Sequence, residues 1–287
     1  MPDNLLYFPY INLPQNDWTM HSLIYYDSVS SIVPDEYFYN PRRYESFMAE
    51  LVRENLVIPL NPIEKLSDPF SLVDPFINFV SRPSYRIDQK RERFNPNPNN
   101  VRINRRKFGI EGVNGQKFNN ELLYRLEQMG LARRNFGNWY DVETVTAGYL
   151  MSYLSNILAH KLDLLPATDQ KFFPNYRAYH KQLIGHEEEQ RRRAALQGVM
   201  PLLVDLDLRK LCRIKEKFSS EIRYLRNSIE QIAMDPRYND ETLLNLKIEE
   251  LNFRKEHFSA KLNESRIGNV IFGTVMGLAG AVYGYVN

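Results

Sequence analysis

The sequence predicts a mixed α/β fold that is predominantly helical. Short apolar runs alternate with helix-forming segments over the first sixty residues, longer helical segments fill the middle, and apolar residues recur every three or four positions in the last third. From these patterns we expect a small N-terminal α/β unit, a helical middle, a C-terminal antiparallel helical hairpin or coiled coil, and a glycine-rich terminal helix. A composition of 43% apolar and 25% charged residues is typical of an ordered globular chain.

The α/β unit is expected over residues 1–80. Asn16 is a suitable cap for the first helix, and Pro41 suits the first turn of the second. The aromatic and β-branched runs predict strands over residues 5–13, 31–34 and 56–60, with helices over 17–30 and 41–55 between them.

Residues 81–116 form a distinct basic segment, and its turn-rich stretch 95–100 excludes helix and central strand. Nine Lys and Arg residues lie between positions 82 and 107, against Asp88 and Glu92. We expect an exposed basic loop or arm that binds an anion, with Phe94 and Phe108 placed to stack on bases; the alternative is a solvated charged loop without a ligand. The candidate anion ligands are Arg91, Arg93, Arg102, Arg105, Arg106 and Lys107.

The remainder of the globular part is expected to be helical. Residues 117–206 predict helices over 119–131 and 142–160, which we assign to the same globular domain. Residues 207–264 carry two apolar seams separated by a turn at 234–240, the pattern of an antiparallel hairpin or a coiled coil with partner chains.

Residues 267–286 contain no charged side chain and are long enough, as a helix, to cross a bilayer. Four glycines share one face of such a helix, which favours close helix association in lipid; they are Gly273, Gly277, Gly280 and Gly284. We therefore expect a transmembrane or oligomerising helix, the alternatives being a packed helix in a soluble protein or a partly irregular segment.

No motif for an enzyme is found in the sequence. It lacks the glycine-rich nucleotide loops, the serine-hydrolase elbow and the zinc-protease helix, so no catalytic residue, metal site or cofactor is predicted. The single cysteine, Cys212, excludes an intrachain disulfide and fits a reducing compartment.

The N-terminal pattern YFPYI at 7–11, with Trp18, LIYYD at 23–27 and IVP at 32–34, resembles an uncharacterised bacterial domain family with no assigned function. The segments at 149–154 and 168–169 are similar to the middle of that family. The architecture, a cytosolic α/β part followed by a helical stalk and one terminal helix, is loosely similar to single-pass membrane effectors of anti-phage defence.

These patterns together predict a membrane-associated, oligomerising sensor and effector, with pore formation in bacterial anti-phage defence as its activity. The cytoplasmic body would be anchored to the inner membrane by the C-terminus and regulated by a nucleotide or a protein partner; the net charge of +2 gives less support to nucleic acid. The alternative is a soluble nucleotide- or nucleic-acid-binding protein that uses the basic arm.

Overall fold

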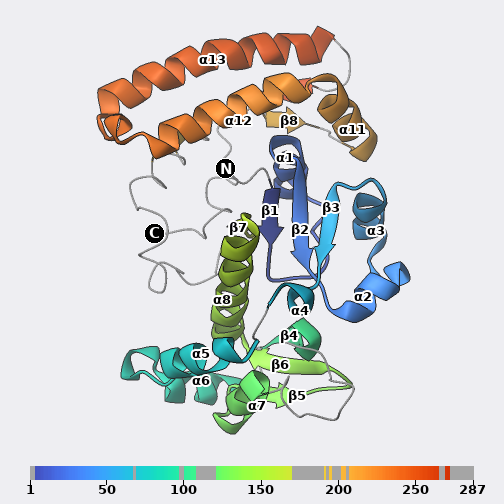
Figure 1. Ribbon diagram of the computed structural model, residues 1–287, viewed down its shortest axis with the longest axis vertical. Helices are drawn as coiled ribbons and strands as arrows, with labels where there is room; N and C mark the ends of the chain where they lie inside the picture. The colour runs from blue at the N-terminus through green and yellow to red at the C-terminus, as the bar shows by residue number, and fades with distance from the viewer. Residues whose placement is uncertain are drawn as a thin grey trace. The chain divides into compact units, whose positions relative to one another are not determined.

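The chain folds as a mixed α/β protein that is predominantly helical, as predicted, and Figure 1 shows its elements in a computed structural model. Two compact units are distinguished, the first formed by residues 1–13 and 30–166 and the second by residues 14–29 and 167–287. The residues that the structure describes are 4–66, 69–96, 100–107, 121–169, 191, 194–195, 202–204, 207–264 and 269–271.

The strands are β1 (Asn4–Tyr7), β2 (Ser28–Ile32), β3 (Val57–Leu60), β4 (Asn100–Asn104), β5 (Ala132–Arg134), β6 (Trp139–Glu143), β7 (Leu165–Ala167), β8 (Leu202–Val204) and β9 (Asn269–Ile271). The α-helices are α1 (Asp17–Tyr25), α2 (Asp35–Tyr39), α3 (Ser46–Arg53), α4 (Pro62–Lys65), α5 (Val73–Val80), α6 (Ile87–Phe94), α7 (Glu121–Gln128), α8 (Thr144–Leu162), α11 (Leu208–Lys217), α12 (Ser219–Met234) and α13 (Glu241–Glu264). Short 3-10 helices are η1 (Pro41–Arg43), η2 (Pro69–Leu72), η3 (Pro83–Tyr85), η4 (Arg105–Lys107) and η6 (Pro236–Asn239).

The first sheet has the strand order β3-β2-β1-β7, and the arrows of β1, β2 and β3 point the same way in Figure 1. The three predicted strands and two predicted helices of this region are present. The second strand begins earlier than predicted, at Ser28, and the other four elements are shorter than predicted. The first strand ends at Tyr7 because Pro9 follows and has no N–H for the ladder. Asn16 caps α1 as predicted, since its Oδ1 accepts from the Thr19 N–H at 3.1 Å.

A second sheet, which the sequence analysis missed, is antiparallel and has the order β4-β6-β5. Its buried face pairs Ile103 with Tyr140 and Ala132 with Val142, and these four side chains lie in the hydrophobic core. The next residues along each strand point to the opposite face. Part of the segment predicted to be a basic loop therefore forms one edge of a sheet.

The longest helix of the first unit is α8, which the apolar pattern predicted. Glu143 caps its first turn, where the Oε2 atom accepts from the Thr146 N–H at 2.8 Å. Leu150 and Leu154 of this helix are fully buried. Its aromatic residue Tyr153 packs against Phe76 of α5, with 5.5 Å between the ring centroids.

In the second unit, α12 and α13 form the predicted antiparallel hairpin around the turn η6, as Figure 1 shows. Phe218 and Phe258 pack edge to face across it at 5.6 Å. Lys215 of α11 donates to the carbonyl oxygens of Leu23, Tyr26 and Asp27 at 2.6, 2.6 and 2.9 Å. An ammonium group in this position satisfies the free carbonyls at the end of α1.

The prediction of one continuous helix over residues 267–286 is wrong, because Asn269–Ile271 form strand β9 and pair antiparallel with β8. Among the described residues, no helix is long and apolar enough to cross a membrane. The predicted transmembrane anchor is therefore wrong. The predictions that depended on it are wrong as well: the membrane-associated effector, the pore or ion channel, and the anchoring to the inner membrane. The glycines of that prediction, Gly273, Gly277, Gly280 and Gly284, lie outside the described residues.

Candidate functional site

The structure divides the predicted anion-binding residues among three elements. Arg91 and Arg93 lie on α6, Arg102 on β4, and Arg105, Arg106 and Lys107 on η4. The structure describes only the backbone of Arg106. The basic residues of the segment also differ in burial, since Lys90 and Lys107 are buried in the first unit whereas Arg102 is exposed.

Lys90 belongs to a buried polar network that holds α6 and α8 together. Its ammonium group donates to the Tyr85 carbonyl and lies 4.0 Å from the centroid of the Tyr85 ring. The Tyr85 hydroxyl pairs with Thr146 Oγ1 at 2.8 Å, and that hydroxyl donates to Glu143 Oε2 at 2.7 Å. Burial lowers the pKa of Lys90 and raises that of Tyr85. The polar groups satisfy one another, so this network is structural.

The outer face of the antiparallel sheet places two arginines around one carboxylate. Arg102 of β4 and Arg133 of β5 both lie directly opposite Asp141 of β6. Arg102 Nε is 3.5 Å from Asp141 Oδ1, and the Arg133 guanidinium also lies over the Phe94 ring at 5.6 Å. One negative charge faces two positive charges here, so the face keeps a local positive excess.

The turn between β5 and β6 presents an aromatic ring to solvent. Phe136 is 91% exposed, and its N–H donates to Asn135 Oδ1 at 2.7 Å. Gly137 has φ = 63°, a left-handed conformation that disfavours other residues. Arg105 fixes the other side of the turn, since its Nε donates to Asn138 Oδ1 at 2.7 Å and its N–H to the Asn138 carbonyl at 2.8 Å.

We call this surface the arginine hairpin: residues 132–143 with Arg102 and Arg105 from the neighbouring segment. It combines an exposed ring, a fixed turn and exposed arginines: Arg102 and Arg133 lie on the outer face, and Arg134, opposite Tyr140, is exposed on the other side of β5. Sequence reasoning found Arg102 and Arg105 but missed Arg133, Arg134 and Phe136. The sequence does contain a signal for this hairpin. A turn around Gly137 is followed by apolar residues at alternate positions, Tyr140 and Val142, which is typical of a strand with one buried face.

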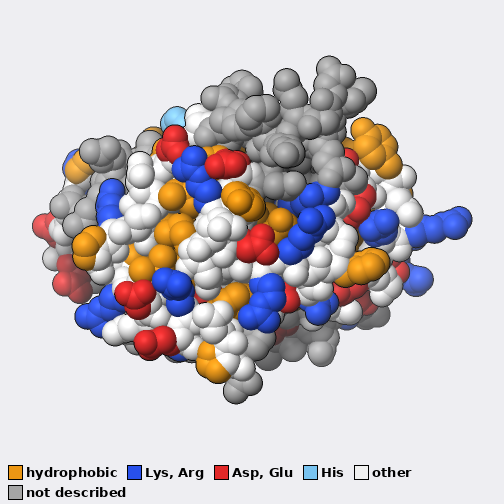
Figure 2. Space-filling view, turned by 90° about the horizontal axis from the view of Figure 1, so that it is seen from below, with side chains coloured by type: hydrophobic (Ala, Val, Ile, Leu, Met, Phe, Trp, Pro, Cys, Tyr) orange, Lys and Arg blue, Asp and Glu red, His pale blue; other side chains and the backbone are white. Residues whose placement is uncertain are grey.

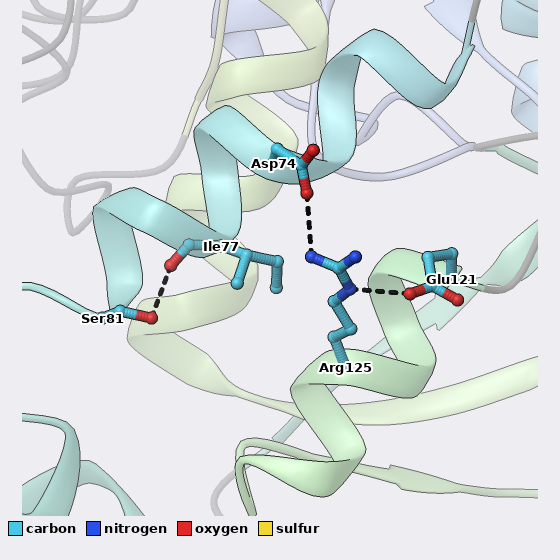
Figure 3. Close-up of polar contacts among 5 residues, drawn as sticks. All are labelled: Asp74, Ile77, Ser81, Glu121 and Arg125. Carbon is cyan, nitrogen blue, oxygen red and sulfur yellow. Dashed lines mark hydrogen bonds and ion pairs between the residues drawn. The ribbon is translucent and has the colours of Figure 1, made fainter.

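Helix α7, which precedes the hairpin, has a different charge pattern. Figure 3 shows Arg125 between two carboxylates, with its Nε 2.6 Å from Glu121 Oε1 and its Nη1 2.8 Å from Asp74 Oδ1. In the same view the Ser81 hydroxyl donates to the Ile77 carbonyl at 2.8 Å, closing the end of α5. The two carboxylates therefore neutralise the charge of Arg125 on α7.

Figure 2 shows basic and acidic side chains interspersed over the face it presents.

A second polar cluster lies at the carboxyl ends of the parallel strands. Lys107, 3% exposed, donates from Nζ to the Pro9 carbonyl just after β1, at 3.0 Å. Asn104 Nδ2 donates to Glu36 Oε1 at 3.0 Å, and Glu36 also lies 3.4 Å from Arg43 Nη1. Burial lowers the pKa of Lys107 from 10.5 to about 7. Of the predicted anion ligands whose side chains the structure describes, Lys107 is the one buried at this edge.

Comparisons of the chain with protein-family models, with curated proteins and with solved structures found no match. Within the described part of the chain, no three His, Cys, Asp or Glu side chains come together as metal ligands would.

Proposed function

We propose that this protein binds single-stranded nucleic acid through the arginine hairpin. The observation that carries the proposal is Phe136, an aromatic ring 91% exposed at the end of a fixed turn and flanked by arginines. Aromatic rings on a positively charged surface stack on unpaired bases with little dependence on sequence, because every base has a π-face.

The arginines supply the electrostatic part of the interaction. Arg102 lies 3.5 Å from the Asp141 carboxylate, Arg133 lies opposite Asp141 in the strand register, and the Arg134 side chain is exposed one residue closer to the turn. Guanidinium groups form paired hydrogen bonds to phosphate oxygens, which suits a backbone that passes beside a stacked base. The net charge of the chain matters little, since the local excess decides such contacts.

A single strand fits the arginine hairpin better than a duplex does, for two reasons. A ring at the end of a turn needs an unstacked base, which a regular duplex does not offer. A helix placed in a groove needs free cationic side chains, whereas on α7 Arg125 is held by Asp74 and Glu121.

The direct test is fluorescence anisotropy with labelled single-stranded DNA and RNA oligonucleotides of mixed sequence. Phe136→Ala should weaken binding about tenfold, because stacking on one base contributes about 1–3 kcal/mol. Tyr39→Ala is the matched control, since Tyr39 is 82% exposed in the same unit but lies on α2. Equal affinity of both variants and the native chain would contradict the role of Phe136.

The charge dependence gives an independent test. Arg133→Ala should reduce the slope of log affinity against log salt by about 0.7, the value for one phosphate contact to a single strand. Arg125→Ala should leave the slope unchanged, because its guanidinium is already paired with two carboxylates. An unchanged slope for Arg133→Ala, or no binding of either oligonucleotide, would refute the proposal.

A further inference from the structure

One short segment, residues 104–107, contacts the residues that follow β1, β2 and β3 along the chain. Asn104 reaches Glu36 in the helix that follows β2, and Lys107 reaches Pro9 after β1. The turn η4 also packs against α4, which follows β3. In open sheets of parallel strands, ligands bind in the crevice outside these ends, where the strand order reverses. The order β3-β2-β1-β7 reverses at β1, the strand that Lys107 approaches.

Lys107 lacks a counter-charge among the described residues. The Pro9 carbonyl is the one hydrogen-bond acceptor of its ammonium group in that part of the chain, and no carboxylate there perturbs it. A buried cation without a negative partner is costly, so the group is either neutral or compensated by an anion.

The charged groups on the neighbouring elements are engaged elsewhere or exposed. Glu36 of α2 interacts with Asn104 and Arg43, and Arg105 holds Asn138. On α4, Glu64 and Lys65 are exposed. None of these groups neutralises the Lys107 ammonium.

A buried hydroxyl on the segment after η1, that of Tyr44, also lacks a partner among the described residues. The side chain of Tyr44 is 7% exposed, and its Oη atom makes no hydrogen bond within the described residues. The next residue, Glu45, donates its N–H to Asn12 Oδ1 at 3.3 Å, which ties this segment to the loop that contains Pro9. A buried hydroxyl without a partner is a donor that a ligand oxygen would satisfy.

We infer that the carboxyl edge of the parallel sheet is a binding site for a small phosphate-bearing molecule, with Lys107 as the cation that pairs with the phosphate. The phosphate oxygen replaces the Pro9 carbonyl as the acceptor of Nζ, a movement that the flexible lysine side chain permits. This site is separate from the arginine hairpin and does not depend on nucleic-acid binding.

The test is isothermal titration calorimetry of the full chain with inorganic phosphate, ADP and ATP, each in two buffers of different ionisation enthalpy. Because the pKa of Lys107 is about 7 without ligand, binding at about pH 8.5 should take up close to one proton. Uptake with all three probes identifies a phosphate site, and uptake with ADP and ATP alone identifies a nucleotide site.

Lys107→Met should lose at least tenfold in affinity together with the proton uptake. The exposed Lys65→Met on α4 should bind as the native chain does, and so should Phe136→Ala, which separates this site from the arginine hairpin. Binding without proton uptake, unchanged affinity of Lys107→Met, or failure of the native chain to bind any of the three probes would overturn the inference.

Discussion

The substitution Lys107→Met tests whether an uncompensated amine lies in the interior of the first unit. Burial lowers the pKa of this group from 10.5 to about 7 in the folded chain, and unfolding restores the ordinary value. Between these two values the unfolded state holds the proton and the folded state has released it. Stability therefore rises with pH across this window, and the penalty is constant below about pH 7 and absent above about pH 10.5.

The magnitude follows from the same two pKa values. One pKa unit corresponds to about 1.4 kcal/mol, so the native chain should gain roughly 2.5 kcal/mol from this lysine between about pH 7.5 and pH 9.5. Methionine has a similar length and no charge, so the variant should lack this gain and be more stable at the lower pH.

The assay is urea unfolding of both proteins, without phosphate, at both pH values. Taking the difference between the proteins at each pH cancels other groups, including Lys215, whose pKa burial lowers to about 8. Lys65→Met serves as a control for loss of a surface charge. The stability difference between the native chain and Lys107→Met could instead be the same at both pH values. The folded chain would then not hold the amine in its neutral, buried form, and the argument would fail.

Three further substitutions give results that the structure fixes in direction. Gly137→Ala should lower the free energy of unfolding by about 1 kcal/mol through its positive φ alone, since no atom lies within 4 Å of the added Cβ; urea titration measures it. Asp141→Asn should strengthen binding of a single-stranded oligonucleotide a few-fold at low salt, because Arg102 loses its ion pair and the negative charge opposite Arg133 is removed, and unchanged anisotropy titrations would count against the proposed surface. Thr146→Val should destabilise the chain by about 2 kcal/mol, because it leaves the buried Tyr85 hydroxyl without its partner and removes the side-chain hydrogen bond to Glu143, and thermal unfolding checks this.

The sequence predicted the elements that depend on local pattern. Helices α1, α8, α12 and α13 follow from apolar spacing and from caps such as Asn16, whose signals lie within a few residues of one another. The antiparallel sheet escaped because β4 pairs with a strand almost forty residues away, and its short strands carry arginines on one face. Propensity does not encode such a pairing, because tertiary contacts decide it.

For the candidate sites, as for the fold, the sequence revealed local patterns but not the tertiary contacts. Counting charges between positions 82 and 107 treats all nine basic residues alike, although burial separates Lys90 and Lys107 from exposed Arg102. Burial of a lysine depends on contacts with Tyr85 or Pro9, which the local sequence does not reveal. The length rule for membrane spans failed in a related way, because β9 forms by pairing with β8 some seventy residues earlier.

Consecutive residues of one segment serve both candidate sites. Arg105 fixes the turn of the arginine hairpin through Asn138, while Asn104 and Lys107 reach the carboxyl edge of the parallel sheet. A ligand that moves Lys107 away from Pro9 therefore acts on the same short turn that positions Phe136. Thermodynamic linkage requires the effect to be reciprocal, so the factor by which ATP changes oligonucleotide affinity must equal the factor by which the oligonucleotide changes ATP affinity. We expect this factor to fall to about one in Asn138→Ala, which removes the side-chain bond to Arg105. An unaltered factor in that variant would show that the coupling does not pass through Asn138.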